Sequence, residues 1–473
     1  MARSIGVIFL ESSKPLKKLA LRVMGDMGTS RLIASLPAGK QPPIIRAMLD
    51  IKLIRDNPEH VRDRIASRGR GDERFIAELT AGDELRRKLL AETESLKSQR
   101  NQVSKQIGQL KAKGEDASAV MASMKEVSDR ITALDKQVGD VAAQLEQILL
   151  TIPNLPHATV PAGKDAADNP EVRRWGAPAQ FDFKPKPHWD IGEGLDILDF
   201  ARATKIAASG FILYKGMGAR LERGLINFLL DLHTRDHGFT EVFPPFLINR
   251  ASMIGTGQLP KFEEDMYRLR DDELYLAPTA EVPVSNIHRD EIFRADELPR
   301  YYCAYTPCFR REAGAAGKDT RGMIRVHQFD KVELIKFCKP ETSYDELEKM
   351  VANAEKVLQL LGLHYRVVLL CSGDMGFASA KTYDIEVWAP GQDKYLEVSS
   401  CSNCEDFQAR RANIRFKDEA GKNRHVHMLN GSGTALARLY VALLETYQQP
   451  DGSVKLPDIL APYLGGRTHI QAG

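Results

Sequence analysis

The feature that most constrains the fold is a pair of apolar seams at heptad spacing, separated by a turn. The first seam repeats every seven residues through Leu89, Leu96, Val103 and Leu110. The second alternates spacings of three and four, which keeps its side chains on one helix face, through Met124, Val127, Ile131, Leu134, Val138, Val141, Leu145 and Ile148. Between them, Lys113-Gly114-Glu115-Asp116 ends a helix and starts a turn. The pattern predicts an antiparallel coiled-coil hairpin whose arms of about 30 residues span roughly 45 Å.

The two predicted arms differ in charge. Basic side chains dominate the first arm and include Arg86, Arg87, Lys97, Arg100 and Lys105, whereas the second arm is acidic. One interpretation is an ordinary solvated coiled coil whose charges set its pairing. The other is a basic stripe that follows a phosphate backbone. Because the net charge of the whole chain is only +2, a nucleic-acid partner would have to meet such a local surface.

The rest of the chain divides by composition. A chain of 473 residues is too long for one ordinary core, so we expect two or three folded units. Residues 1–47 lack periodicity and are predicted to be a disordered extension. Residues 48–155 form the domain that carries the hairpin, and residues 156–190, rich in Pro, Gly and Asp, form a linker.

Residues 191–473 mix helical and strand-like runs, which predicts an α+β domain with a mainly antiparallel sheet. The expected strands are 267–276, 302–309, 324–338, 365–370, 382–387 and 395–398. The expected helices are 211–236, 343–361 and 434–447.

The cysteines indicate a reducing compartment. There are six, all beyond residue 300, and they do not form a dense disulfide framework, so the cytoplasm is the expected setting. Cys401 and Cys404 form a lone CxxC pair, which we interpret as buried or incidental thiols rather than a metal site. No apolar run approaches the ~18 residues of a membrane span.

Charged residues cluster around a predicted strand–loop–strand hairpin. Arg310, Arg311 and Glu312 follow an apolar strand, and after a Gly-rich loop the residues 324–334 alternate like a second strand. Buried charges are costly unless they are paired or bind a ligand. Either an internal salt-bridge network or a polyphosphate site built on guanidinium groups would explain the cluster. The usual phosphate-binding loop, G-x-x-x-x-G-K-[ST], is absent from the sequence.

Several of these stretches together resemble one family. Residues 309–312 with residues 325–329 resemble motif 2 of class II aminoacyl-tRNA synthetases, and residues 430–438 resemble motif 3, a Gly-rich turn that leads into a helix bearing an Arg. Residues 238–245 resemble motif 1, the dimer element. Residues 279–281, 397–400 and 401–404 are similar to stretches typical of seryl-tRNA synthetases, and the hairpin is also typical of them. The resemblance covers Met48 to about Leu464.

This resemblance implies a class II catalytic domain that follows the N-terminal hairpin. It implies activation of L-serine by ATP to seryl-adenylate and transfer to tRNA(Ser), and to a selenocysteine tRNA where a cell has one. It further implies Mg²⁺, a cytoplasmic homodimer and no membrane partner. Neither step demands a protein nucleophile, so positioning and charge stabilisation should carry catalysis.

The resemblance also implies roles for single residues. Arg310 and Arg438 are the implied catalytic residues: Arg310 holds the α-phosphate and reaches the serine carboxylate, and Arg438 holds the γ-phosphate. Phe329 stacks on adenine, Glu312 lies near its amino edge, and Glu397 and Ser400 hold Mg²⁺. Arg311, Val398 and Ser399 complete the ATP-binding set. The serine set comprises Thr279, Ala280, Glu281, Glu333, Asn430 and Ser432. The tRNA set comprises Arg86, Arg87, Lys97, Arg100 and Lys105.

Alternatives remain open at this stage. Taken singly, Phe329 has an ordinary interpretation as a core aromatic, Thr279 as a strand or cap residue and Ser432 as a residue near a helix N-cap. Other functions are a class II synthetase for threonine or proline, a synthetase-like protein without catalysis, and a ligase that charges a carrier protein. The hairpin and residues 279–281 disfavour a synthetase for threonine or proline. The intact Arg310, Glu397 and Arg438 disfavour a protein without catalysis. The hairpin also disfavours a ligase that charges a carrier protein.

Overall fold

The computed structural model describes residues 49–313 and 321–472, which fall in one unit that runs from Pro42 to Gly473. The predicted disordered extension, residues 1–47, lies outside the described residues. So does most of the Gly-rich loop between the two strands of the charged cluster, at residues 314–320. Within the described ranges, no helix combines the length and apolar character needed to cross a membrane.

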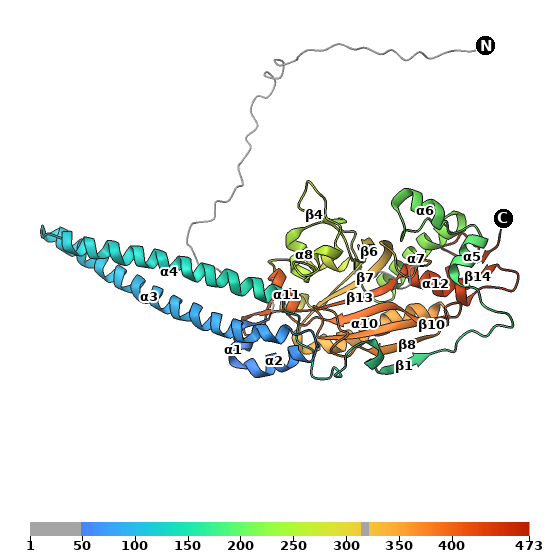
Figure 1. The fold of residues 1–473 in the computed structure, drawn as a ribbon, viewed down its shortest axis with the longest axis horizontal. Coiled ribbons are helices and arrows are strands. Elements are labelled where there is room, and N and C mark those ends of the chain that lie inside the picture. The colour runs from blue at the N-terminus through green and yellow to red at the C-terminus, as the bar shows by residue number, and fades with distance from the viewer. Residues whose placement is uncertain (1–48, 314–320, 473) are drawn as a thin grey trace, which may run out of the picture. The chain divides into compact units, whose positions relative to one another are not determined.

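Two long helices form the predicted hairpin. Helix α3 (Phe75–Lys113) and helix α4 (Ser118–Thr151) lie side by side and antiparallel (Figure 1). Helix α3 ends at Gly114, which has a left-handed backbone with φ of 74° and donates its N–H to the carbonyls of Leu110 and Lys111. A glycine is favoured there because other residues are strained in that conformation. The turn predicted from the sequence is therefore a glycine C-cap.

The buried stripe of α4 follows the predicted seam only in part. Ile131, Leu134, Val138 and Leu145 are buried as expected. Toward the base of the hairpin, full burial moves from the predicted Val141 and Ile148 to their neighbours Ala142 and Leu149. An α-helix drifts about 20° per heptad relative to a perfect seven-residue repeat. The short helices α1 (Ile51–Asp56) and α2 (Pro58–Ala66) contribute to the same apolar cluster at this end.

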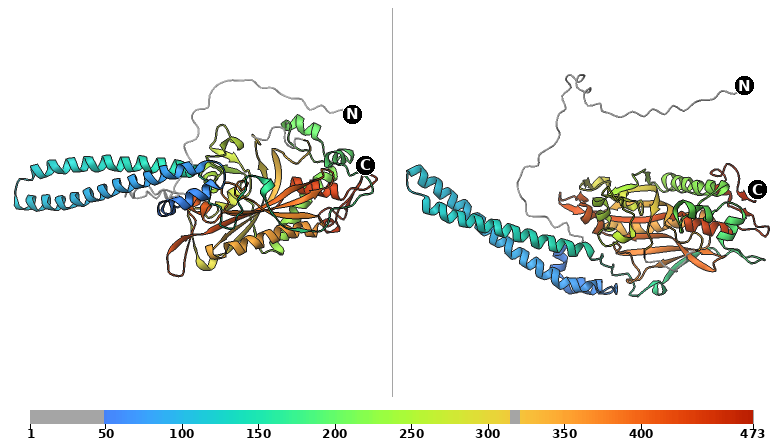
Figure 2. Two further views of the ribbon diagram at one scale, coloured as in Figure 1. Left: turned by 60° about the horizontal axis from the view of Figure 1, so that its bottom comes forward. Right: turned by 45° about the horizontal axis from the view of Figure 1, so that its top comes forward.

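The central sheet of the second part of the chain has eight strands and is antiparallel except for one pair (Figure 2). Its order is β1 (Glu171–Trp175), β8 (Tyr365–Leu369), β9 (Lys381–Ala389), β10 (Lys394–Asn403), β13 (His427–Ala435), β7 (Gln328–Cys338), β6 (Arg300–Phe309) and β2 (Thr240–Glu241). Only β2 and β6 are parallel. The α+β class with a mainly antiparallel sheet is thus confirmed. The edge strand β1 comes from the segment that we expected to be a linker.

Strand β13 corrects the sequence interpretation most clearly. The Gly-rich stretch 430–433 was expected to be a turn, but it runs through the middle of the sheet between β10 and β7. A Cβ on Gly431 would lie 2.7 Å from Met350 Sδ, and a Cβ on Gly433 would lie 2.7 Å from His233 Nε2. The glycines therefore serve close approach of the strand to its neighbours rather than reversal of the chain.

The long helices that pack against the sheet include α7 (Gly216–Arg235), α10 (Ser343–Leu360) and α12 (Leu436–Thr446). Met350 belongs to α10 and His233 to α7, so the glycine side of β13 faces these helices. Because side chains alternate along a strand, Asn430 and Ser432 point to the opposite face.

The expected boundaries shift where tertiary contacts intervene. The helix expected from residue 211 begins at Gly216, and the strand expected from residue 324 begins at Gln328. The strand expected over 267–276 shrinks to β4 (Leu274–Leu276), which pairs with β3 (Leu247–Asn249). The other elements are α5 (His188–Gly194), α6 (Phe200–Ala207), α8 (Arg250–Thr256), α9 (Glu281–Ser285), α11 (Phe407–Ala412), β5 (Ile292–Arg294), β11 (Arg415–Lys417), β12 (Asn423–His425), β14 (Val454–Lys455) and β15 (His469–Ile470).

The hairpin seam gives a first prediction. Leu134 is fully buried in the seam, so Leu134→Ala should destabilise the hairpin by about 2–5 kcal/mol, through lost burial and the cavity left behind. Amide hydrogen exchange along α3 and α4 measures the local opening. Leu85→Ala on α3 is the matched control, because that side chain is 47% exposed and its loss should cost under about 0.5 kcal/mol. Equal loss of protection in the two variants would contradict the predicted seam.

Candidate active site

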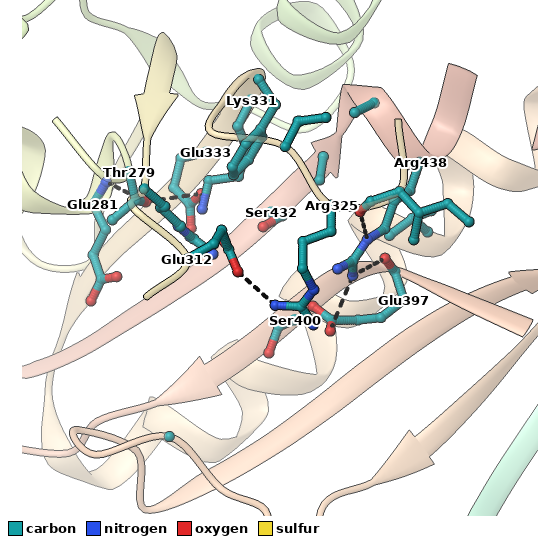
Figure 3. A pocket seen from close by; sticks show the side chains of 18 of the residues that line it. Thr279, Glu281, Glu312, Arg325, Lys331, Glu333, Glu397, Ser400, Ser432 and Arg438 are labelled. Carbon is teal, nitrogen blue, oxygen red and sulfur yellow. Dashed lines mark hydrogen bonds and ion pairs between the residues drawn. The ribbon is translucent and has the colours of Figure 1, made fainter. Parts of the chain in front are cut away.

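A cavity of about 380 Å³ brings together residues that are far apart in the sequence (Figure 3). Strands β7, β10 and β13 supply much of its wall, and the first turn of α12 closes one side. Among the residues named from the sequence, it is lined by Thr279, Glu281, Arg310, Glu312, Phe329, Glu333, Glu397, Val398, Ser400, Asn430, Ser432 and Arg438. The charges that were ambiguous in the sequence therefore surround one space, and the ion pairs that form among them in the described residues include Arg325 with Glu312 and Lys331 with Glu333.

Three residues of the predicted set do not line this cavity. Ala280 is fully buried in an apolar cluster beside the cavity. Ser399 points away from it and donates its hydroxyl to the backbone carbonyl of Ser432 at 2.5 Å, so it braces β13 from behind. Arg311 is exposed and contributes a backbone N–H to the carbonyl of Asp265. Each lies next in sequence to a lining residue, but its side chain is directed elsewhere.

One end of the cavity is acidic. Glu281 stands at the start of α9 and accepts hydrogen bonds from the side-chain amides of Gln408, at 2.6 Å, and Asn430, at 3.1 Å. Glu333 on β7 lies close by and is paired with the ammonium of Lys331. Burial raises the pKa of Glu281 to about 7, and the negative charge of Glu333 adds to this effect. Figure 3 shows these groups together with Thr279 on one side of the cavity.

The cavity wall also combines an aromatic face with cations. The Arg310 guanidinium lies 5.2 Å from the centroid of the Phe329 ring, and its Nε donates to the carbonyl of Pro278 at 3.3 Å. Arg325 donates to the carboxylate of Glu312 at 2.6 Å. Phe329 is only partly buried, which leaves an aromatic face available to a planar ligand.

The other end holds Arg438, Glu397 and Ser400. Arg438 donates to the backbone carbonyl of Glu397 at 2.8 Å and contacts its carboxylate at 3.4 Å. Ser400 pairs across the strands with Asp384, one of whose carboxylate oxygens has no hydrogen-bond partner among the described residues. Burial and the nearby Glu397 raise the pKa of Asp384 well above its ordinary value. The excess of carboxylates in this region suits a cation.

The sequence reasoning missed some lining residues. Lys331 lies two residues from both Phe329 and Glu333 on β7, so strand alternation alone places it on the cavity face with them. Arg325 was part of the motif but received no role. Gln258 follows α8 and reaches the cavity only through the folding of the chain, so no local pattern could have found it.

Comparisons with known proteins identify the family of both folded parts of the chain. A family model of the seryl-tRNA synthetase N-terminal domain matches residues 48–156, and a model of the class II tRNA synthetase core domain (G, H, P, S and T) matches residues 261–447. The serine–tRNA ligase of Carboxydothermus hydrogenoformans is 58% identical over 419 residues, which are 88% of this chain and 98% of that protein. That of Geobacter sulfurreducens is 58% identical over 89% of this chain and its own full length, 100%.

Solved structures give the same result. The seryl-tRNA synthetase from Pyrococcus horikoshii complexed with ATP matches with a TM-score of 0.85 and 40% identity, over 90% of this chain and 100% of its own. The cytoplasmic serine–tRNA ligase from Naegleria fowleri in complex with AMP matches with a TM-score of 0.80 and 31% identity, over 90% and 99%. With its hairpin, its antiparallel sheet and its charged cavity, this chain belongs to the serine–tRNA ligases, the class II aminoacyl-tRNA synthetases that attach serine to tRNA.

Proposed function

We propose that the cavity holds L-serine at its acidic end and ATP across its aromatic and cationic part, so that the two react without a protein nucleophile. The observation that carries this proposal is the charge order along the cavity. Carboxylates of Glu281 and Glu333 lie at one end, Arg325 lies between, and Arg438 lies at the other end. Arg310 and Phe329, which contact each other, also line the cavity. An amino acid and a nucleoside triphosphate, laid end to end, present ammonium, carboxylate and phosphates in an order that complements the charges of the cavity.

At the serine end, a carboxylate faces the substrate ammonium. Glu333 is the stronger candidate for this role, because its carboxylate already pairs with an ammonium group, that of Lys331. Glu281, whose oxygen already accepts two amide donors, is the acceptor near the serine hydroxyl. A site built to bind that hydroxyl rejects alanine strongly, because the acceptor would otherwise be left unpaired.

At the ATP end, Phe329 stacks on adenine and Glu312, held by Arg325, lies toward its amino edge. Arg310 bridges the α-phosphate and the serine carboxylate, and Arg438 holds the γ-phosphate. The serine carboxylate oxygen attacks the α-phosphorus, and the bond to pyrophosphate breaks. A terminal ribose hydroxyl of the tRNA then attacks the seryl carbonyl, and AMP leaves. Fixed guanidinium groups stabilise the charge that develops on the phosphate oxygens.

Glu397 and Ser400 would hold Mg²⁺. Both line the cavity with oxygen atoms, which this hard cation prefers, and Asp384 pairs across the strands with Ser400 and keeps one carboxyl oxygen without a partner among the described residues. When bound, the ion would neutralise phosphate charge. Arg438, which already contacts Glu397, remains the residue that orients the far phosphate.

Exposed and buried side chains support proposals for the oligomeric state and the cellular compartment. The chain is proposed to be a homodimer, since residues 238–245 resemble the dimer element and Phe243 within them is 73% exposed. The cytoplasm is the proposed setting. All six cysteines, Cys303 through Cys404, are free and buried, as expected for a protein kept in reducing conditions.

The basic arm of the hairpin is proposed to hold tRNA(Ser) by its backbone. Among the residues suggested for this role, Arg87 and Lys105 are exposed. Arg86 and Arg100 share a heptad position with the buried Thr93 and are half-buried against α4, and Lys97 pairs with Asp135 of α4 at 2.9 Å. Arg87 and Lys105 are therefore the better tRNA contacts.

Two cavity variants should separate the substrates. Phe329→Leu removes the stacking platform, which is worth about 1–3 kcal/mol per base, and should raise the KM for ATP about tenfold while the KM for serine stays nearly constant. Glu333→Gln should raise the KM for serine about tenfold while the KM for ATP stays nearly constant. Both constants come from serine-dependent ATP–pyrophosphate exchange without tRNA. If each variant raises both constants equally, the proposed order of substrates in the cavity is wrong.

The raised pKa of Glu281 predicts a pH-dependent stability. Its folded-state pKa of about 7 lies above the ordinary 4.5, so its contribution to stability is complete below the ordinary value and is lost as pH rises toward 7. Glu281→Gln cannot ionise, so its Tm should rise relative to the unmodified protein between about pH 5 and about pH 8. Glu263→Gln is the control. The hydrogen bond from Tyr275 lowers the pKa of Glu263 below 4.5. The difference in Tm between Glu263→Gln and the unmodified protein should therefore stay constant over the same pH range. A constant difference for Glu281→Gln would refute the predicted titration.

The tRNA role of the hairpin is tested by reversing exposed charges. Arg87→Glu with Lys105→Glu should raise the KM for tRNA(Ser) about tenfold or more and leave ATP–pyrophosphate exchange unchanged, because phosphate contacts are lost far from the cavity. Lys125→Glu with Lys136→Glu reverses the same charges at exposed positions of α4 and serves as the matched control. Unaltered aminoacylation by the α3 variant, or equal loss in both, would remove the tRNA role from this arm.

A further inference from the structure

A buried arginine links the base of the hairpin domain to the cavity. Arg68 follows α2 and is only 2% exposed, among the most deeply buried large side chains of the described residues. Its guanidinium donates to the backbone carbonyls of Asn154, Met375, Gly376 and Ser379, at distances between 2.6 and 3.3 Å. Asn154 lies after α4, and the other acceptors belong to the loop of residues 372–380 between β8 and β9, here called the junction loop.

The junction loop is held from the same side by several further bonds. Asn154 donates its amide to the carbonyls of Ala378 and Cys404, both at 2.9 Å, and its backbone N–H to Phe377. Ser372 donates its hydroxyl to the carbonyl of Ser67 at 2.6 Å. The backbone of the loop is therefore fixed by groups from the hairpin domain.

The opposite side of the junction loop faces the proposed serine end. Gly376 lines the main cavity. Gly376, Ala378 and Ser379 also line a neighbouring cavity of about 170 Å³, whose wall they share with Glu281 and Asn430. The carbonyls that Arg68 binds thus belong to the stretch of backbone that forms the cavity wall next to the carboxylate proposed to meet serine.

The same contact reaches a second lining segment. Phe377 of the junction loop packs against Phe262 with ring centroids 5.7 Å apart, and a Cβ on Gly257 would lie 3.3 Å from the Phe377 ring. Gln258, between these two residues, lines both cavities. A shift of the junction loop would therefore move Gln258 as well as Gly376.

The chemistry of Arg68 suits it to hold several backbone carbonyls at fixed positions. Burial lowers the pKa of Arg68 to about 9, so it stays charged at neutral pH. A buried charge is tolerated only when acceptors surround it, and a planar guanidinium can span several carbonyls that a lysine ammonium, as a single point, cannot. The group is thus suited to set the spacing between the residues after α4 and the junction loop.

We propose that Arg68 is a positioning residue for serine binding, which acts through the backbone of residues 375–379. The proposal rests on the proposed placement of serine beside Glu281. It touches no substrate. Its effect should therefore fall on the serine end alone, and it should be present without tRNA, because the contact is part of the folded chain.

The test is ATP–pyrophosphate exchange by the full chain without tRNA. Arg68→Lys keeps the charge but loses the fork, and should raise the KM for serine about tenfold while the KM for ATP stays within about twofold. Arg64→Lys is the matched control. Arg64 lies on α2 and also donates to carbonyls, those of Pro156 and His157. None of its hydrogen bonds among the described residues reaches the junction loop. It should leave both constants within about twofold.

A second variant keeps the proposal testable if Arg68→Lys folds poorly. Gly376→Ala adds a methyl group to the wall with only an ordinary 3.5 Å contact to Ser379 Oγ, and should also raise the KM for serine selectively. An equal rise of both KM values in Arg68→Lys, or an unchanged KM for serine in Gly376→Ala, would overturn the proposal. If Glu333→Gln still raises the KM for serine in that case, only the role of Arg68 fails. If Glu333→Gln has no such effect, the placement of serine itself is wrong.

Discussion

The close packing of β13 against α10 and α7 is the constraint on which the active site depends. Without side chains at Gly431 and Gly433, the strand lies within contact distance of Met350 and His233. That approach sets the depth of Asn430 and Ser432 on the other face and fixes where α12 begins. Arg438 stands in the first turn of α12, so its place in the cavity follows from the same packing. A larger residue at either glycine would move both ends of the cavity together.

The cavity also depends on charges that are costly to bury and only partly neutralised within the protein. Lys331 balances Glu333, and Arg325 balances Glu312. Among the residues that the structure describes, Glu281 accepts side-chain hydrogen bonds from amides alone, and Asp384 keeps an unpartnered oxygen. The protein therefore retains electrostatic strain that a cationic ligand would relieve. Preorganised charges of this kind stabilise a transition state without reorganisation at the moment of reaction, which suits a transfer between two bound substrates. The raised pKa of Glu281 is the sign of that strain at the acidic end of the cavity.

The sequence was informative where structure is set by local periodicity and less so where it is set by distant contacts. The hairpin could be predicted because heptad spacing and Gly114 act within a few residues. Strand β13 could not be predicted, because its glycines are required by close packing against Met350 and His233, which are far away in the sequence. Neighbours in a motif also do not share a face: Ser400 lines the cavity, whereas Ser399 braces β13 from behind. The same alternation applied to Phe329 and Glu333 would have identified Lys331.

The stability of the hairpin is graded along its length, and this gradient has a functional meaning. At its base, Ile54, Leu79, Leu145 and Leu149 form a buried cluster, and charge-assisted bonds from Arg68 tie that base to the body. Farther out, beyond Ile131 toward the turn, seam side chains such as Val103 and Met124 are only partly buried. Exposed ion pairs such as Arg130 with Glu92 add less than about 1 kcal/mol each. Bending should therefore occur toward the turn at Gly114 and not at the junction. An arm that bends at its tip and stays fixed at its base would suit the proposed binding to a tRNA backbone, because its bending would leave the cavity wall undisturbed.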